Sequence, residues 1–333
     1  MKLNKSLLVS LLLTASLAIS CAVEPDDDKD IAFDRMMTSW IRVNYPSVKP
    51  FGIHGAYVLE MDKGDGTPIG DSAYVRVFYT KQALDGTIMD TNIEDIDKQT
   101  GSYSASYNYT GNTWRMTQGY VPDALEEVLR TMRDGGSTRI ALPKSSSHHN
   151  TSMYDAFSST EESNNYVYSI EIDTVVTDII GYQDKEMRKW FRAHYDSEDT
   201  ISEHQFFKKL EEKTADTDTI KDGASINVYY IGRLMDGQVF DTNIEDTAKF
   251  YRIWSSAKDY KALSLTFHKS EEESSGSNGM VEGFEQAIRQ MNYGEKAVTL
   301  FNSELGYGEA GKNPGVPEYS PLSFWLYIDP AKN

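Results

Sequence analysis

The 333-residue sequence has little of several residue types on which common catalytic and structural devices depend. Cys21 is its only cysteine, which excludes an intramolecular disulfide framework. None of its 6 histidines lies in the His-Glu-x-x-His spacing of a zinc peptidase. The adjacent His148 and His149 lack an evident third ligand, so we interpret them as a polar loop pair rather than a metal site. No arrangement of His, Cys and Ser indicates nucleophilic catalysis.

Positive charge is also scarce. The chain has 33 lysines and arginines against 51 aspartates and glutamates, a formal net charge of −18 at pH 7. An acidic surface repels phosphate backbones, and no basic stripe with interleaved aromatic residues offsets this repulsion. These features exclude nucleic acid as the expected partner.

The one long apolar run lies at the N-terminus. Residues 7–19 follow two lysines, and this run is shorter than the about 20 apolar residues that span a bilayer. The pattern predicts a signal peptide over residues 1–20. Small residues just before Cys21 resemble a bacterial lipobox, which implies that Cys21 becomes the acylated first residue and carries palmitate-type chains. An ordinary secretory signal followed by an unmodified thiol is the alternative.

An acidic stretch follows the expected lipid. Residues 21–30 include three consecutive aspartates, Asp26 to Asp28. These residues lack the alternating spacing and the turn glycine of a calcium loop, so we interpret 21–30 as a solvated tether. Acylation would make the membrane a partner. We therefore expect a lipid-anchored protein of the bacterial cell envelope, most consistent with the outer membrane, on its periplasmic or surface face.

The strongest feature of the sequence is an internal repeat. Residues 85–95 return as residues 236–246 with three substitutions, at an offset of 151 (241 minus 90). Residues 40–47 are echoed by residues 190–197, at an offset of 150. Two separate matches at nearly one offset indicate a duplicated unit, and a repeat of this length is a whole domain.

Each unit is expected to open with a helix. The second leading helix carries Met187, Trp190, Phe191 and Tyr195, and Phe206, Phe207 and Leu210 suggest a further helical stretch. We expect Trp40 and Trp190 to be core residues. The first leading helix carries an apolar stripe that ends before Pro46: Ile31, Met36, Met37, Trp40, Ile41 and Val43.

The rest of each unit reads as strands with one short helix. Asp85-Gly86 and Asp236-Gly237 are strong hairpin signals. One short helix is expected at 122–132 in the first unit and at 281–291 in the second. The other apolar runs are short and alternate like half-buried strands. The pattern predicts an α+β fold in which each unit is a curled antiparallel sheet wrapped over one short helix.

The second unit resembles a known family, the FKBP-type peptidyl-prolyl cis-trans isomerases, over residues 222–328. The order and spacing of its motifs carry the resemblance, and no single piece is decisive. The motifs are Val228-Tyr229-Tyr230-Ile231-Gly232, Asp236-Gly237 with Val239-Phe240-Asp241, Met280-Val281-Glu282-Gly283-Phe284-Glu285, Met291 with Gly294-Glu295-Lys296-Ala297, Gly306-Tyr307-Gly308, Gly315-Val316-Pro317, and Leu322 with Phe324.

The resemblance implies a role for each matching position. Tyr307 matches a hydroxyl donor above the pocket, and Asp241 matches an acid that orients a tyrosine and nearby carbonyl dipoles. Met280 and Val281 match the pair that leads the helix, where the Val281 amide would bind the substrate carbonyl. One more pocket wall should come from residues 263–267. The residues that match the lining of a proline pocket are Tyr230, Phe240, Phe284, Val316 and Phe324, with Phe284 standing where an indole is common.

The chemistry implied by this resemblance needs no cofactor, metal or nucleophile. An Xaa-Pro amide isomerises slowly because it must lose resonance, with a barrier of roughly 18–20 kcal/mol. An apolar pocket favours the twisted, less polar amide, while fixed donors hold the flanking carbonyls. A thousandfold acceleration requires only about 4 kcal/mol.

The first unit keeps the expected scaffold but loses much of the expected pocket. Met89 replaces Phe240, and Leu125 replaces Phe284. Pro122 falls on Val281 and has no amide hydrogen, so the donor would be missing. By counting from the end of the short helix, His148 falls where Tyr307 stands. We therefore expect a degenerate copy without isomerase activity, serving as a structural, binding or dimerising module.

These interpretations divide the chain into a signal peptide at 1–20, a tether at 21–30, a degenerate FKBP-like unit at 31–181, a helical linker at 182–221 and an isomerase-like unit at 222–330. The favoured function is a prolyl isomerase or foldase that acts on proline-containing polypeptides of the cell envelope through the second unit. The alternative is a non-catalytic peptide-binding chaperone or assembly lipoprotein.

Overall fold

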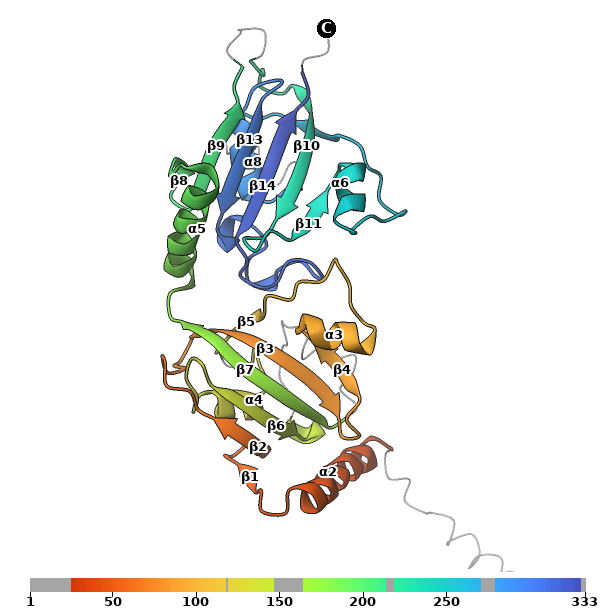
Figure 1. The fold of residues 1–333 in the computed structure, drawn as a ribbon. Coiled ribbons are helices and arrows are strands. Elements are labelled where there is room, and N and C mark those ends of the chain that lie inside the picture. The colour runs from red at the N-terminus through yellow and green to blue at the C-terminus, as the bar shows by residue number, and fades with distance from the viewer. Residues whose placement is uncertain (1–24, 118, 147–163, 214–218, 271–278, 331–333) are drawn as a thin grey trace, which may run out of the picture.

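The chain folds into two similar α+β units that follow one another along the sequence (Figure 1). The computed structural model describes residues 25–117, 119–146, 164–213, 219–270 and 279–330. Cys21, residues 1–20 and the His148-His149 pair lie outside these ranges. Within the described residues, no helix is long and apolar enough to cross a membrane.

The first unit is built on a seven-stranded antiparallel sheet in the order β1-β2-β6-β7-β3-β4, with β5 paired to β3. Its helices are α2 (Pro25–Asn44), α3 (Glu94–Thr100) and α4 (Asp123–Leu129), with a 3₁₀ turn η1 (Lys144–Ser146). Its strands are β1 (Pro50–Phe51), β2 (Ala56–Asp62), β3 (Tyr74–Ala83), β4 (Ile88–Thr91), β5 (Asn112–Arg115), β6 (Ser137–Leu142) and β7 (Tyr166–Val176).

The second unit repeats this sheet in the order β11-β10-β14-β13-β9-β8, with β12 paired to β10. Its helices are α5 (Ile179–Tyr195), α6 (Glu245–Phe250) and α8 (Glu282–Arg289), with 3₁₀ turns η5 (Ser303–Leu305) and η6 (Gly308–Ala310). Its strands are β8 (Thr200–Ser202), β9 (Gln205–Glu211), β10 (Ser225–Arg233), β11 (Val239–Thr242), β12 (Leu263–Thr266), β13 (Lys296–Phe301) and β14 (Leu322–Ile328).

The strand orders correspond element by element, as the duplicated sequence predicts. β3 and β10 are central strands, and each forms a hairpin with the strand that carries the repeated motif. Gly86 and Gly237, in the two hairpin turns, have φ angles of 91° and 93°, a backbone region that favours glycine. The predicted α+β fold and both hairpins are therefore confirmed.

Each sheet is covered on both faces. In the second unit, α8 packs on one face through the fully buried Phe284, together with Phe301 and Phe324. The leading helix α5 packs on the opposite face, where Met187 and Phe191 contact residues of β9 and β13. In the first unit α4 and α2 take the same two places. The leading helices are thus an outer layer of each unit, in addition to the one short helix expected beneath each sheet.

The helical stretch suggested by Phe206, Phe207 and Leu210 is wrong, because these residues lie in strand β9. Phe206 faces α5 and Phe207 faces the core under α8, so both faces of this strand are buried and it reads as a continuous apolar run. Since β9 pairs with β13, the second unit begins at β8 and not at residue 222, and the predicted linker 182–221 is mostly part of that unit.

The N-terminal helix also differs from expectation. α2 begins at Pro25, inside the predicted tether 21–30, and a proline followed by acidic residues is typical of a helix start. The predicted stripe of α2 is only partly buried. Met37 and Ile41 pack on the sheet, whereas Ile31, Met36 and Val43 are exposed. Trp40 and Trp190 are half-buried and pack against the outer-face clusters.

Candidate functional site

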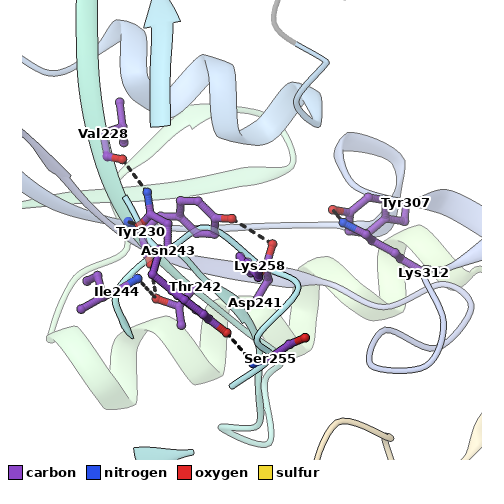
Figure 2. A network of polar contacts seen from close by, with 11 residues as sticks. Val228, Tyr230, Asp241, Thr242, Asn243, Ile244, Ser255, Lys258, Tyr307 and Lys312 are labelled. Atoms are coloured by element: carbon purple, nitrogen blue, oxygen red, sulfur yellow. Dashed lines mark hydrogen bonds and ion pairs between the residues drawn. The ribbon is translucent and has the colours of Figure 1, made fainter. Parts of the chain in front are cut away.

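The repeated Asp-Thr-Asn motif holds the hairpin strand against the central strand. In the second unit Asn243 Oδ1 accepts a hydrogen bond from the Tyr230 amide at 2.9 Å, and its Nδ2 donates to the Val228 carbonyl at 2.8 Å. Thr242 Oγ1 donates to the Tyr230 carbonyl at 2.6 Å (Figure 2). Asn92 and Thr91 make the same bonds in the first unit. The threonine and asparagine of the repeated motif are therefore architectural.

Four aromatic rings gather beside this hairpin. The Phe324 ring lies at the centre, with ring centroids 5.7 Å from Phe240, 5.2 Å from Phe284 and 6.1 Å from Tyr230. Two of these contacts, those to Phe240 and Phe284, are nearly perpendicular, an arrangement that aromatic pairs favour. Phe324 and Phe284 are almost fully buried and Phe240 is half-buried, so the cluster opens toward solvent on the Phe240 side.

A polar network borders the rings. Tyr230 Oη donates to Asp241 Oδ2 at 2.9 Å, and Lys258 Nζ forms an ion pair with Asp241 Oδ1 (Figure 2). Burial, followed by the negative charge of Asp241, raises the pKa of Tyr230 well above its ordinary value. Because the hydroxyl therefore stays protonated, it remains a donor that holds Asp241, and it cannot act as a base near neutral pH.

The start of α8 provides a backbone donor next to the rings. Val281 is the N-cap residue of α8, with extended backbone angles, and its carbonyl accepts the first helical hydrogen bonds. In the part of the chain that the structure describes, the Val281 amide has no acceptor. Met280 and Val281 are half-buried and pack on the core that contains Phe284. The arrangement leaves an N–H group at the edge of an apolar site.

The loop between β13 and β14 supplies the remaining predicted residues. Val316 is 2% exposed and belongs to the core of the second unit, and Tyr307 is half-buried against it. Tyr307 Oη accepts a hydrogen bond from Lys312 Nζ at 3.2 Å (Figure 2). The structure therefore brings together all nine predicted residues: Tyr230, Phe240, Asp241, Met280, Val281, Phe284, Tyr307, Val316 and Phe324.

The region 263–267 contributes through one face of β12 and the residue after it. Leu263, Leu265 and Phe267 alternate along the chain and all pack on the cluster that contains Tyr230 and Phe284. These three side chains therefore belong to the core that supports the site, and the additional wall stays a prediction.

Sequence reasoning missed two residues of this site, Lys258 and Gly232. Lys258 lies in a variable loop, so its spacing along the sequence does not predict that it contacts Asp241. Gly232 pairs with Asp241 on one side and with Phe324 on the other. An ideal Cβ at Gly232 would lie 2.7 Å from Phe240 Cζ and 2.9 Å from Phe324 Cε1. The glycine was visible in the Tyr-Tyr-Ile-Gly motif, and its role is to admit these two rings.

The first unit differs at the corresponding positions. The strand pairing aligns Lys81 with Gly232 and Tyr168 with Phe324. Pro122 is the N-cap residue of α4, as Val281 is of α8, so this copy has a proline where the free amide stands. Leu125 occupies the place of Phe284 in the helix. The Tyr79–Asp90 hydrogen bond is retained, at 2.6 Å. The match of His148 to Tyr307 falls outside the described residues.

The second unit is thus an α+β domain with an aromatic site, oriented hydrogen-bond donors and no nucleophile among its described site residues. Its sequence from residue 216 to residue 328 matches the family model described as FKBP-type peptidyl-prolyl cis-trans isomerase. Over that range, about a third of the chain, the second unit is similar in sequence to this isomerase family.

Individual proteins show the same similarity. The chain is 27% identical over 117 residues to FK506-binding protein 1A of Aspergillus fumigatus, covering 35% of this chain and 86% of that protein. It is 31% identical over 124 residues to the peptidyl-prolyl cis-trans isomerase FKBP15-2 of Arabidopsis thaliana, covering 37% and 63%. It is 23% identical over 252 residues to the human isomerase FKBP9, covering 75% and 33%. The chain spans less than two thirds of the latter two proteins.

Proposed function

We propose that the second unit catalyses cis-trans isomerisation of Xaa-Pro bonds in polypeptide clients. The observation that carries the proposal is the convergence of Phe240, Phe324 and Tyr230 on one site that also presents the Val281 amide. Three strands and the start of α8 supply these groups, so their convergence is a property of the fold and not of one sequence segment.

The geometry supports catalysis by positioning and environment. The proline ring would pack on Phe240 and Phe324, and the carbonyl of the substrate would accept from the Val281 amide. The twisted amide loses resonance and polarity, so an apolar wall stabilises it relative to the planar ground state. The Tyr230–Asp241 pair fixes the polar edge of the pocket, and Tyr307 offers a hydroxyl on the opposite loop.

The test is prolyl exchange measured by NMR on a short Xaa-Pro peptide with the full chain. Phe240→Ala removes an aromatic wall, and we expect kcat/KM to fall at least about tenfold. Phe250→Ala is the matched control, because Phe250 is 79% exposed on the same unit and outside the site. Tyr307→Phe should lower kcat/KM by a smaller factor, since it removes one hydroxyl.

The outcomes separate three possibilities. Loss of activity in Phe240→Ala but not in Phe250→Ala supports the proposal. Full activity in a folded Phe240→Ala chain would mean that catalysis takes place at another site, such as the first unit. No acceleration by the folded wild-type chain would leave a peptide-binding domain, the non-catalytic chaperone or assembly function.

We further propose that this activity serves the bacterial cell envelope and that the protein is anchored there by a lipid on Cys21. The support is the apolar run at 7–19 and the small residues before Cys21. Mass spectrometry of the mature N-terminus decides this, since an acylated Cys21 is the expected result and a free thiol contradicts the anchor. The clients would then be proline-containing envelope proteins.

We also propose that the first unit does not itself catalyse isomerisation. The proposal rests on Pro122 at the N-cap position and on Lys81 in place of the glycine that admits two rings. In the full-chain assay, the residual rate of Phe240→Ala gives an upper limit on any contribution from this unit.

A further inference from the structure

A loop of the first unit contacts the proline site of the second. This docking loop, residues 103–112, connects α3 to β5 and reaches the turn between β10 and β11 and the loop between β13 and β14. In Figure 1 the segment that precedes β14 lies between the two sheets. The turn leads directly into β11, which carries Phe240 and Asp241, and the β13–β14 loop carries Tyr307 and Val316.

Asn108 is the centre of this contact and is 3% exposed. Its Nδ2 donates to Gln238 Oε1 at 2.6 Å and to Asp236 Oδ2 at 3.3 Å, two residues of the turn that leads into β11. Its backbone amide donates to the Pro314 carbonyl at 3.2 Å. One residue therefore ties together the two segments that form opposite sides of the proline site.

The orientation of the Asn108 amide is fixed from within its own loop. Its Oδ1 accepts from the Thr110 amide at 2.9 Å and from Thr110 Oγ1 at 2.6 Å. Gln238 Nε2 returns a bond to the Tyr107 carbonyl at 2.9 Å. Since both oxygen acceptor positions of the amide are used inside the loop, its two N–H groups point outward to the second unit.

A pocket of the first unit also takes part in this contact. The pocket next to the retained Tyr79–Asp90 pair is lined by Met89, Asp90, Tyr107 and Tyr109, and by Pro314 of the second unit. Burial raises the pKa of Tyr107, which places this side chain in an environment with little solvent. A proline of the second unit thus borders the pocket beside Met89 and Asp90, the counterparts of Phe240 and Asp241.

The residue after Pro314 links this contact to the aromatic site. An ideal Cβ at Gly315 would lie 3.0 Å from the Ser106 carbonyl oxygen and 3.3 Å from Phe240 Cβ. Gly315 therefore lies directly between the docking loop of the first unit and Phe240. A displacement of the docking loop would reach the wall of the proline site through one residue.

We propose that the first unit is a positioning domain for the second, and that Asn108 is the positioning residue that holds the Phe240 wall and the β13–β14 loop in register. This inference rests on the proposed isomerase function. The second repeat offers a contrast at the equivalent position, Asp259, whose side chain is 71% exposed and pairs with Lys261 on the surface. Docking is thus a property of the first copy's loop.

The test is a mirrored pair of substitutions in the full chain, Asn108→Asp and Asp259→Asn. Asn108→Asp is nearly isosteric but replaces two donors by a carboxylate that faces Asp236 and the Gln238 oxygen. We expect kcat/KM for a short Xaa-Pro peptide to fall about tenfold, the usual scale for a buried donor lost against a charged acceptor. Asp259→Asn should leave kcat/KM within twofold.

Two further variants keep the result decisive if Asn108→Asp affects folding. Gln238→Ala removes the partner from the other side, and its effect should not add to that of Asn108→Asp, because both break the same contact. Gly315→Ala places a methyl group between Ser106 and Phe240 and should lower the activity while the docking loop keeps its sequence. Backbone NMR signals of Phe240 and Val316 should shift in all three variants and not in Asp259→Asn.

Each outcome decides one claim. Unchanged activity in folded Asn108→Asp, with shifted Phe240 and Val316 signals, overturns the inference, as does the absence of any shift at these residues. If the wild-type chain does not accelerate exchange, the proposed function fails by itself. The inference is then decided by the peptide affinity in the same NMR titration, which must weaken about tenfold in Asn108→Asp.

Discussion

The closeness of Gly232 to two rings makes it the most informative single position of the proline site. We predict that Gly232→Ala disrupts the site without removing any functional side chain. The added Cβ would lie 2.7 Å from Phe240 Cζ and 2.9 Å from Phe324 Cε1. Carbon atoms in good contact are about 3.5–4.0 Å apart, so the Phe240 ring must retreat by about 0.8 Å or more.

Two opposing terms set the size of the effect on stability. Replacing a strand glycine by alanine reduces the entropy of the unfolded chain and stabilises by about 0.5–1 kcal/mol. Overpacking a filled core costs about 1–3 kcal/mol. The steric cost is larger, so we expect the free energy of unfolding to fall by about 1–2 kcal/mol. We expect kcat/KM to fall at least about tenfold, because the wall no longer fits the twisted amide.

Prolyl exchange NMR and denaturant unfolding of the full chain measure both effects. Gly70→Ala is the matched control, since a Cβ there meets nothing within 4 Å. It should leave kcat/KM unchanged and the stability equal or higher. The reasoning is refuted if Gly232→Ala keeps kcat/KM within twofold of wild type and loses no stability.

Two other predictions concern how the second unit is held together. Glu295 is fully buried; its burial alone would raise its pKa, but the Lys209 ion pair at 2.9 Å and backbone amides outweigh this and lower it. The ionised carboxylate therefore stabilises the fold fully at pH values above the pKa of the unfolded chain. Chemical denaturation at a series of pH values should show this contribution lost as the pH falls through the lower pKa of the folded chain. Glu295→Gln should reduce this dependence of the unfolding free energy on pH. Trp190→Phe removes the 2.6 Å hydrogen bond from Nε1 to the Met235 carbonyl and should lower the free energy of unfolding by about 1 kcal/mol. An unchanged midpoint of thermal unfolding would mean that the packing of α5 does not depend on this bond.

Much of the fold could be predicted from the sequence because the repeat doubles every signal. The two Asp-Gly turns, the short helices and the later strands of each unit lie where the pattern of apolar residues and turn residues indicates. The nine site residues converge because motif order fixes their positions on β10, β11 and β14, in and just before α8, and in the β13–β14 loop. The Asp-Thr-Asn motif was visible as a repeat, but only the hydrogen bonds of Asn243 and Thr242 show that it secures a hairpin.

The incorrect and missed predictions arise because a single sequence does not reveal which faces of a strand are buried or which distant residues a side chain contacts. Phe206 and Phe207 lie next to each other on a strand that is buried on both sides, so no alternation marks it as a strand. Asn108 lies in a polar loop, and its importance comes from residues 128 and 130 positions away. Lys258 likewise meets Asp241 across a loop whose length sets no register.

The central claim is that the second unit isomerises Xaa-Pro bonds at the Phe240–Phe324 site with the Val281 amide as a donor. The most direct test is titration of the full chain with an Xaa-Pro peptide, with backbone amide shifts and cis-trans exchange followed in the same NMR samples. The account predicts accelerated exchange together with a shift of the Val281 amide signal. It predicts no comparable shift of the amide signals at the N-terminus of α4 in the first unit, where Pro122 is the N-cap residue. Accelerated exchange with a stationary Val281 amide, or shifts confined to the first unit, would contradict it.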